Sequence, residues 1–416
     1  MWFWMILGLA LGLFWLRRVV QAFFGMRRVA DLSTSQFDGA PANCGQELPR
    51  VTIVVPARNE AVHVEATIHS LLALDYPDYR IVAVDDRSTD ATGEILDRLA
   101  AASPERLQVL HVRELPPGWL GKTHAMWRAA SQPSPTTNDR PLSTGSDDRR
   151  LATDEWLLFT DADTIFRPDS LRRAVIYTLQ SKADHLAVFP KIDTATFGGH
   201  IMVAFFGVLF VFWRRPWKVS DPHAPDAIGL GVFNLIRRQA YEKIGTWKSL
   251  RLCVVEDVML GEAVKKYGLK QSAAMGQDLL TNFWSRDAAG VIRNLSKNFF
   301  AAAHFKIGRA LVICGIFLIL HVLPYVGVVV APGWAKAGFG VALAGIALMY
   351  IGMSRQPNVS PLYFFAHPFA ALSFVFIMLR SMALALRNGG VTWRGTTYPL
   401  EELRRGSTDT GGDSIL

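Results

Sequence analysis

Two aspartates, Asp161 and Asp163, directly follow the apolar, strand-like segment 156–159. Side chains two residues apart on an extended chain point to the same side, so both carboxylates leave the strand end together. Paired carboxylate oxygens suit Mg²⁺ or Mn²⁺, whose remaining positions are filled by substrate phosphates. The pattern predicts a divalent metal site, although an Asp-x-Asp sequence alone is equally consistent with a polar turn after a buried strand.

Acidic side chains also follow two other strand-like segments. Asp85 and Asp86 come after 81–84, where a carboxylate can accept a hydrogen bond from the base N–H of a uridine-like nucleotide. Glu60 ends the sequence PARNE after the first strand, where it can bind a ribose hydroxyl. Turn formation and helix capping are the structural alternatives for these residues. Three successive strands with such ends predict one site at the carboxyl edge of a parallel sheet.

Lys122 ends the sequence PGWLGK, between a strand-like segment and a helix that starts near Thr123. Glycines permit close approach of the backbone, and a lysine at a helix start can neutralise a diphosphate. The complete phosphate loop with Gly-Lys-Ser/Thr in the required frame is missing, which argues against an ATPase. Trp119 is alternatively only an apolar anchor of the loop.

Asp257 lies in the sequence VVEDVML, which opens a helix closed by Gly268. One interpretation makes Asp257 the general base that takes the proton from an acceptor hydroxyl. The alternative is structural, because the helix dipole favours acidic residues in a first turn. The loop 229–233 upstream either shapes an acceptor pocket or is only a turn.

Strand-like and helix-like segments alternate between residue 49 and residue 159. This order predicts an α/β fold with a mostly parallel sheet covered by helices on both faces. The strand-like segments are 51–55, 81–84, 107–112 and 156–159, and the helix-like ones are 61–74, 91–101 and 121–130. The segment 131–153 is rich in Ser, Pro, Thr, Asn, Asp and Arg, and we expect a disordered insertion there.

Four apolar segments flank this region, at 2–16, 310–330, 337–353 and 362–386. About 20 apolar residues in a helix span a bilayer core. We therefore expect an N-terminal transmembrane anchor at 1–28, a soluble domain at 49–290, C-terminal transmembrane segments at 310–386 and a tail at 387–416. Between the first two apolar segments the composition is mixed, and no further span is expected there.

Four arginines, at positions 17, 18, 27 and 28, follow the first apolar segment. Basic residues at the C-terminal end of this segment predict that the soluble domain lies in the cytoplasm. A signal peptide would instead have basic residues before the apolar segment and a cleavage site after it. The net charge of +8 is consistent with a protein surface that lies against anionic lipid headgroups. The alternative is that the basic residues only determine the membrane topology. No nucleic-acid partner is expected. The three cysteines are scattered and read as structural.

Six segments occur in an order that resembles the inverting family 2 glycosyltransferases with a GT-A, Rossmann-like fold. They are VTIVVPARNE, VAVDDRSTDATGE, PPGWLGKTHA, LLFTDADT, IGLGVFNLIRRQAYEKIG and VVEDVMLG. The Pro-Gly-Trp-x-Gly-Lys segment and the closing VTWRGTTYP are similar to the branch that acts on hopanoid, carotenoid and related lipids. The resemblance spans roughly 49–398, and the combined order is specific.

This resemblance implies a role for each matching residue. The nucleoside would be held by Pro56, Glu60 and Asp85, with Asp86 beside it. Lys122 would lie near the donor, Asp161 and Asp163 would bind the metal diphosphate, and Asp257 would be the base. The implied reaction is a single in-line displacement that inverts the anomeric carbon, with the metal stabilising the departing diphosphate.

Processive members of the family carry Gln-x-x-Arg-Trp after the base, and the matching stretch 293–300 lacks it. This difference argues against a polysaccharide synthase. The aromatic and basic residues of 291–309 instead predict an interfacial helix on the membrane surface.

Four spans would place 391–398 on the side opposite to the soluble domain, whereas the arginines around it favour the same side. Arg380 also interrupts the last apolar segment. We therefore expect 362–386 to be a re-entrant or broken pair of helices, with Pro361 and Pro368 as the breaking residues.

The sequence as a whole predicts a multi-pass enzyme of a bacterial inner membrane. It would transfer a sugar from a nucleotide diphosphate sugar, a UDP-sugar by preference, to a lipid or isoprenoid-type acceptor. Transfer to a polyprenyl phosphate carrier is the alternative. A transporter would place polar groups inside its spans and would have more of them, and a scaffold would not need acidic strand ends.

Overall fold

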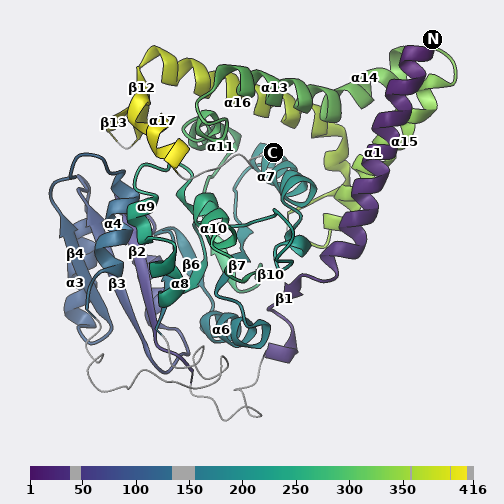
Figure 1. The fold of residues 1–416 in the computed structure, drawn as a ribbon. Helices are drawn as coiled ribbons and strands as arrows, with labels where there is room; N and C mark the ends of the chain where they lie inside the picture. The colour runs from purple at the N-terminus through teal and green to yellow at the C-terminus, as the bar shows by residue number, and fades with distance from the viewer. Residues whose placement is uncertain (38–47, 134–154, 357, 394, 410–416) are drawn as a thin grey trace.

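The computed structural model describes residues 1–37, 48–133, 155–356, 358–393 and 395–409. Residues 134–153 of the predicted insertion lie outside them. A unit built on a central sheet carries the predicted site residues and is called the catalytic unit below. It lies below a layer of apolar helices (Figure 1). The two parts are in contact along the top of the sheet.

The central sheet has eight strands in the order β1-β10-β7-β9-β5-β2-β3-β4. Only β9 runs antiparallel to its neighbours, β5 and β7, so the predicted α/β fold with a mostly parallel sheet is confirmed. The strands are β1 (Ala30–Asp31), β2 (Val51–Ala57), β3 (Tyr79–Asp86), β4 (Leu107–Val112), β5 (Trp156–Phe159), β7 (His185–Phe189), β9 (Asn234–Arg237) and β10 (Gln271–Met275).

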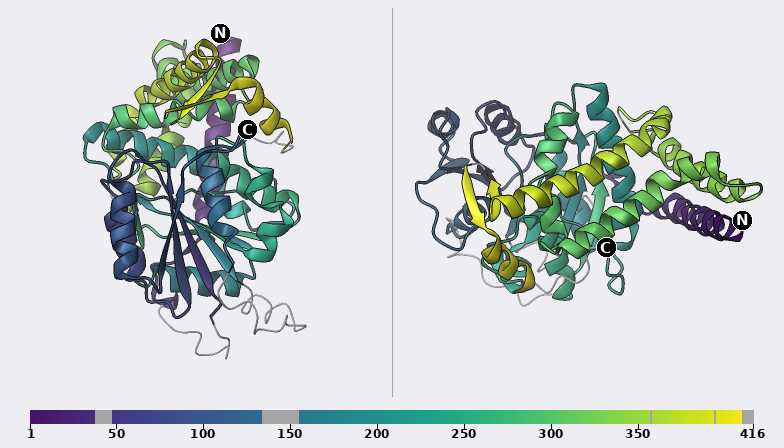
Figure 2. Two further views of the ribbon diagram at one scale, coloured as in Figure 1. Left: turned by 90° about the vertical axis from the view of Figure 1, so that its left-hand side faces the viewer. Right: turned by 90° about the horizontal axis from the view of Figure 1, so that it is seen from above.

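Helices cover both faces of this sheet (Figure 2). Strand β2 shows why, because its side chains alternate between two cores. Ile53 and Val55 pack with Ile68 on one face, and Val54 packs with Ala125 on the other. The covering helices are α2 (Val64–Leu72), α3 (Thr92–Ala102), α4 (Gly121–Ala130), α6 (Ser170–Ser181), α8 (Arg238–Lys243), α9 (Thr246–Ser249) and α10 (Glu256–Lys266).

The chain that follows β5 enters a small second sheet. It consists of β6 (Thr164–Phe166), β11 (Leu280–Asn282) and β8 (Lys191–Ile192), with β11 in the middle. Because β6 begins one residue after Asp163, the pairing of β6 with β11 holds the segment that follows β5.

In the described part of the chain, five helical stretches are long and apolar enough to cross a membrane, and they form the apolar layer. Four match the predicted segments, and the fifth, Phe197–Lys218, corrects the expectation of mixed composition there. The elements are α1 (Trp2–Met26), α7 (Phe197–Leu209) with η2 (Phe210–Arg214) and η3 (Pro216–Lys218), α13 (Ile307–Phe317), η4 (Leu318–Val322), α14 (Leu323–Val330), α15 (Ala335–Met353) and α16 (His367–Arg387).

Helices α1 and α15 pack side by side and run in the same direction. Gly8 lies against Ala335, and Trp15 lies against Gly345 further along both helices. At Gly12 a Cβ would come within 2.6 Å of the Gly338 carbonyl oxygen. Small residues allow this close backbone approach, as is common between membrane helices.

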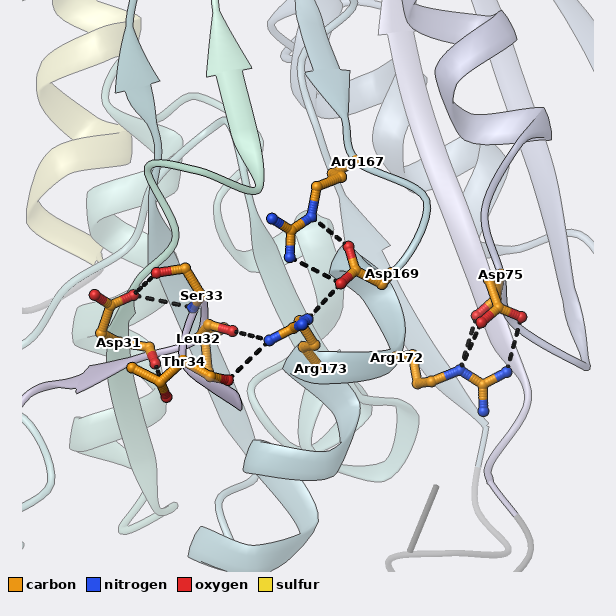
Figure 3. A network of polar contacts seen from close by, with 9 residues as sticks. All are labelled: Asp31, Leu32, Ser33, Thr34, Asp75, Arg167, Asp169, Arg172 and Arg173. Atoms are coloured by element: carbon orange, nitrogen blue, oxygen red, sulfur yellow. Dashed lines mark hydrogen bonds and ion pairs between the residues drawn. The ribbon is translucent and has the colours of Figure 1, made fainter. Parts of the chain in front are cut away.

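The segment after α1 is tied to the catalytic unit by a polar network (Figure 3). The Arg173 guanidinium on α6 donates to the carbonyl oxygens of Leu32 and Thr34, both at 2.9 Å. Asp169 accepts from Arg167 and from Arg173. Since β1 also pairs with β10, the segment after α1 is fixed to the sheet by backbone pairing as well.

Two expectations for the C-terminal half differ from the structure. The range 291–309 forms no single helix, because α11 (Ala288–Leu295) and α12 (Phe299–Ala302) are separated, and α13 begins only at Ile307. Phe300 and Phe305 are buried against the layer instead of facing outward. The segment 362–386 is not a broken pair, because Pro368 lies in the first turn of α16, where proline fits an unbroken helix.

The chain returns from α16 to the catalytic unit. The short hairpin β12 (Gly390–Trp393) and β13 (Thr396–Pro399) follows α16, and α17 (Leu400–Asp409) follows the hairpin. A short 3-10 helix of six residues, η5 (Pro361–Ala366), precedes α16.

Candidate active site

A cavity of about 620 Å³ lies at the carboxyl edge of the sheet, where β5, β2 and β3 end side by side. It extends from these strand ends to α11 and the hairpin beneath the apolar layer. Seven of the eight predicted site residues line it, namely Pro56, Glu60, Asp86, Lys122, Asp161, Asp163 and Asp257. The sheet thus brings together Pro56 and Asp257, which are 201 positions apart in the chain.

Asp161 and Asp163 leave the end of β5 together, as the spacing predicts. Asn282 Nδ2 donates to Asp163 Oδ1 at 2.8 Å and so orients this carboxylate from the second sheet. Burial, Asp161 and Glu60 raise the pKa of Asp163 to about 7. Such mutual repulsion in a buried site is relieved when a cation binds.

The donor set fits a divalent cation that shares its ligands with a substrate. Within the described residues, no group of three or more His, Cys, Asp or Glu side chains is placed to hold a metal ion. Two carboxylates with the oxygens of a diphosphate are the usual surroundings of Mg²⁺ in nucleotide sites. Asp161 and Asp163 are therefore suited to a metal that arrives with its phosphate ligand.

Lys122 lies between the carboxylates at the end of β5 and the acidic pair that opens α10. Its ammonium lies 2.7 Å from Asp161 Oδ1 and 2.8 Å from Glu256 Oε1. Burial alone would lower the pKa of Lys122, but the carboxylates of Asp161, Glu256 and Asp257 outweigh burial and raise this pKa well above its usual value. Lys122 therefore stays cationic beside Asp161 and Glu256, and its role near a donor diphosphate stays a prediction.

Asp257 opens α10, and its carboxylate is held by two backbone N–H groups. Gly231 donates to Oδ2 at 3.0 Å, and Val258 donates to Oδ1 at 2.8 Å. Burial raises the pKa of Asp257, while the nearby Lys122 ammonium opposes this rise. The carboxylate therefore combines a fixed orientation with increased basicity, as a general base requires.

The loop 229–233 approaches the site closely because Gly229 and Gly231 have no side chains. A Cβ on Gly231 would lie 2.7 Å from Asp161 Oδ2, and one on Gly229 would lie 1.7 Å from the Asp257 carbonyl oxygen. This loop therefore contacts both the proposed metal ligand and the proposed base, and it sets the spacing between them.

Asp85 is the one predicted site residue that does not line the cavity. Its Oδ1 accepts from the Ser88 N–H at 3.2 Å, and its Oδ2 lies 3.0 Å from His111 Nδ1. Asp86 does line the cavity and forms a two-point ion pair with Arg87 at 2.8 and 2.9 Å. The contact of Asp85 with the Ser88 N–H is therefore explained by turn formation. The role of Asp85 in nucleoside binding stays a prediction.

Several lining residues were not identified as site residues from the sequence. Tyr398 and Trp393 of the hairpin reach the cavity, and the Gly121 N–H donates to the Tyr398 hydroxyl at 3.2 Å. The segment VTWRGTTYP, which carries both residues, was a signal of family resemblance but not of contact with the site. Arg286 and Arg293 line the α11 side and are exposed.

Comparison with known proteins finds several that are similar to this chain. The 4,4'-diaponeurosporenoate glycosyltransferase of Staphylococcus aureus (strain MRSA252) is 21% identical over 360 residues, which cover 85% of this chain and 89% of the relative. A mannosyltransferase, PcManGT from Pyrobaculum calidifontis, solved with GDP-Man and Mn²⁺, is 19% identical with a TM-score of 0.47 and covers 92% of this chain and 98% of its own. S. aureus TarS 1-349 with UDP-GlcNAc is 14% identical with a TM-score of 0.40, covering 82% and 92%.

The family itself is shown by a model described as "Glycosyltransferase like family 2", which matches residues 49–293. The match covers more than half of the chain and includes every predicted site residue. The mostly parallel sheet agrees with the GT-A fold that the resemblance implied. The chain therefore belongs to glycosyltransferase family 2 and is a glycosyltransferase.

Proposed function

We propose that the protein transfers a sugar from a nucleotide diphosphate sugar, a UDP-sugar by preference, to a lipid-like acceptor by a metal-dependent inverting displacement. One observation carries this proposal. Lys122 contacts both Asp161 and Glu256, the neighbour of Asp257, so the proposed metal-diphosphate ligands and the proposed base share one cavity. An inverting transfer needs both groups, on opposite sides of the anomeric carbon.

The donor would bind at the strand ends. Pro56, Glu60 and Asp86 line the part of the cavity next to β2 and β3, and they are proposed to hold the nucleoside with Asp85 behind them. Asp161 and Asp163 would hold Mg²⁺ or Mn²⁺, which supplies positive charge for the leaving diphosphate.

The chain's own residues would then perform the transfer. Asp257 takes the proton as the acceptor O–H bond breaks, and the acceptor oxygen forms the new bond to the anomeric carbon. The bond from that carbon to the diphosphate breaks, and its electron pair leaves with the diphosphate. The ammonium of Lys122 stabilises the charge that develops there.

The acceptor is proposed to be a lipid because the cavity continues beneath the apolar layer. Its α11 side lies next to α7 and α16, two of the five apolar helices. The S. aureus relative is named for transfer to a carotenoid acid, which supports an isoprenoid-type acceptor here. We further propose a bacterial inner membrane with the catalytic unit in the cytoplasm, following the arginines after α1.

A polyprenyl phosphate is the second candidate acceptor. Arg286 and Arg293 are exposed cations at the α11 side of the cavity, where they would attract a phosphate headgroup. Replacing both with glutamine separates the two candidates. Transfer to a polyprenyl phosphate should fall by at least tenfold, whereas transfer to an uncharged lipid alcohol should change little.

The direct test uses the purified full-length protein in lipid nanodiscs. UDP- and GDP-sugars are supplied with Mn²⁺ and an extract of bacterial membrane lipids, and products are identified by mass spectrometry. We expect a glycosylated lipid of inverted anomeric configuration, abolished by EDTA and by Asp163→Asn. Products of retained configuration, or undiminished transfer in EDTA, would refute the proposed mechanism.

A further inference from the structure

We infer that a buried polar network of His185, Gln271 and Asn234 positions the loop 228–231 and, through this loop, the carboxylate of Asp257. The three residues come from the neighbouring strands β7, β10 and β9, and none of them lines the cavity. They are therefore positioning residues and not catalytic ones. The inference rests on the proposed function, because that function makes Asp257 the base.

His185 lies between the two amide side chains in the interior of the protein. All three residues are buried. His185 Nδ1 lies 3.0 Å from Gln271 Nε2, and His185 Nε2 lies 3.1 Å from Asn234 Oδ1. Burial lowers the pKa of His185 to about 4, so at neutral pH the ring is uncharged and has one donor and one acceptor nitrogen.

The loop determines the direction of each hydrogen bond in this network. The Ile228 N–H donates to Gln271 Oε1 at 3.0 Å, so Gln271 Nε2 faces His185 as a donor. The Leu230 N–H donates to Asn234 Oδ1 at 3.1 Å, so this oxygen faces His185 as an acceptor. His185 therefore accepts at Nδ1 and donates at Nε2. The network thus holds the loop backbone at two points, which are two residues apart.

The loop and the network both contact the helix that carries Asp257. The Gly231 N–H, one residue after Leu230, donates to Asp257 Oδ2 at 3.0 Å. Gln271 Nε2 donates to the Gly261 carbonyl oxygen on α10 at 3.2 Å. Strands β7 and β10 pair with each other, and β10 packs against α10 (Figure 1). The same amide group therefore fixes the loop and the base-carrying helix relative to each other.

A positioning role explains why this part of the core is polar. The net gain from a buried hydrogen bond is small, and apolar side chains of similar shape can stabilise a fold equally well. A fully satisfied polar network, in contrast, specifies one arrangement of its members. Gly229 and Gly231 have no side chains that could anchor the loop, so its backbone N–H groups provide the anchoring. A shift of the loop would move the donor that orients Asp257.

Two apolar substitutions of similar shape test the network in the full-length protein in lipid nanodiscs. Gln271→Met and Asn234→Leu remove its hydrogen bonds but fill its space. Val175→Ala is the control, because Val175 of α6 is buried in the core on the other face of β7 and its truncation lowers stability without touching the network. A misplacement of about 1 Å can lower a rate by about 10²-fold, so we expect a loss of this order in kcat for both test variants.

The KM for the donor should change little in both test variants, because the network touches no donor-binding residue. Val175→Ala should keep the wild-type kcat despite its lower melting temperature. Asn234→Asp keeps an oxygen for the Leu230 N–H, so it should transfer sugar faster than Asn234→Leu although it buries a charge. Equal kcat values for Asn234→Asp and Asn234→Leu, or equal losses in Val175→Ala and Gln271→Met, would overturn the inference.

Hydrogen exchange, resolved to single amides by mass spectrometry, tests the loop without any transfer. In the wild type, the Ile228 and Leu230 amides should exchange as slowly as the amides of β9. Gln271→Met should make the Ile228 amide exchange faster, whereas Val175→Ala should not. Fast exchange of both amides in the wild type would overturn the inference. A wild-type protein with a protected loop that transfers no sugar would contradict only the proposed function.

Discussion

Replacement of Asp257 by asparagine separates catalysis from structure at the start of α10. Both carboxylate oxygens accept backbone N–H groups, from Gly231 at 3.0 Å and from Val258 at 2.8 Å. An asparagine has one acceptor oxygen, so one of these donors loses its partner at a cost of about 1–3 kcal/mol. Removing a buried charge whose pKa is raised by burial offsets part of this cost.

The expected loss of stability is therefore small, and the loss of turnover is large. A general base contributes about 10²–10⁴-fold to the rate, so transfer by Asp257→Asn should fall within this range. The melting temperature should fall by about 2–4 °C for each kcal/mol lost. Affinity for nucleoside diphosphate and Mn²⁺ should stay within about threefold of wild type, because Asp161 and Asp163 are unchanged.

The assay pairs calorimetric binding of the nucleoside diphosphate with a transfer assay well below the melting temperature. Asp184→Asn is the matched control, because Asp184 Oδ2 also accepts a backbone N–H, from Lys270 at 2.9 Å, and lies outside the cavity. The control should lose stability and keep normal transfer. Transfer by Asp257→Asn at the wild-type rate would remove Asp257 from the mechanism and leave it a purely structural residue.

Three further predictions concern the same cavity. The pKa of Asp163 is raised to about 7, so its carboxyl group is protonated below this pH. The affinity for Mn²⁺, measured by calorimetry, should therefore fall as the pH drops from 8 to 6. Asp163→Asn should abolish this pH dependence. Lys122→Met leaves the buried Glu256 carboxylate without its cation and should lower the free energy of unfolding in urea by about 3–5 kcal/mol. An unchanged urea midpoint would show that the ion pair between Lys122 and Glu256 is not formed. Tyr398→Phe removes the acceptor of the Gly121 N–H and should cost about 1–3 kcal/mol, and a hairpin detached from the cavity would show no change in the same measurement.

Much of the catalytic unit could be predicted from the sequence because its signals are local. The strands 107–112 and 156–159 and the helix 121–130 have the predicted bounds in the structure. Each is defined by apolar periodicity and by turn residues within a few positions. The carboxyl ends of parallel strands meet at one edge whatever the loops do, so the convergence of Asp86 and Asp163 also followed from the strand order.

Other features were decided only by contacts between distant parts of the chain. The pairing of Lys122 with Glu256 and the contact of Tyr398 with Gly121, 277 positions away, have no local signature. The apolar helix α7 was missed among mixed sequence, and the apolar run of α16 reads the same whether the helix spans a bilayer or lies over a cavity. The apolar sequence of a helix shows that its side chains are removed from water. Whether lipid or another part of the protein covers these side chains depends on the contacts at the two ends of the helix, which the sequence does not give.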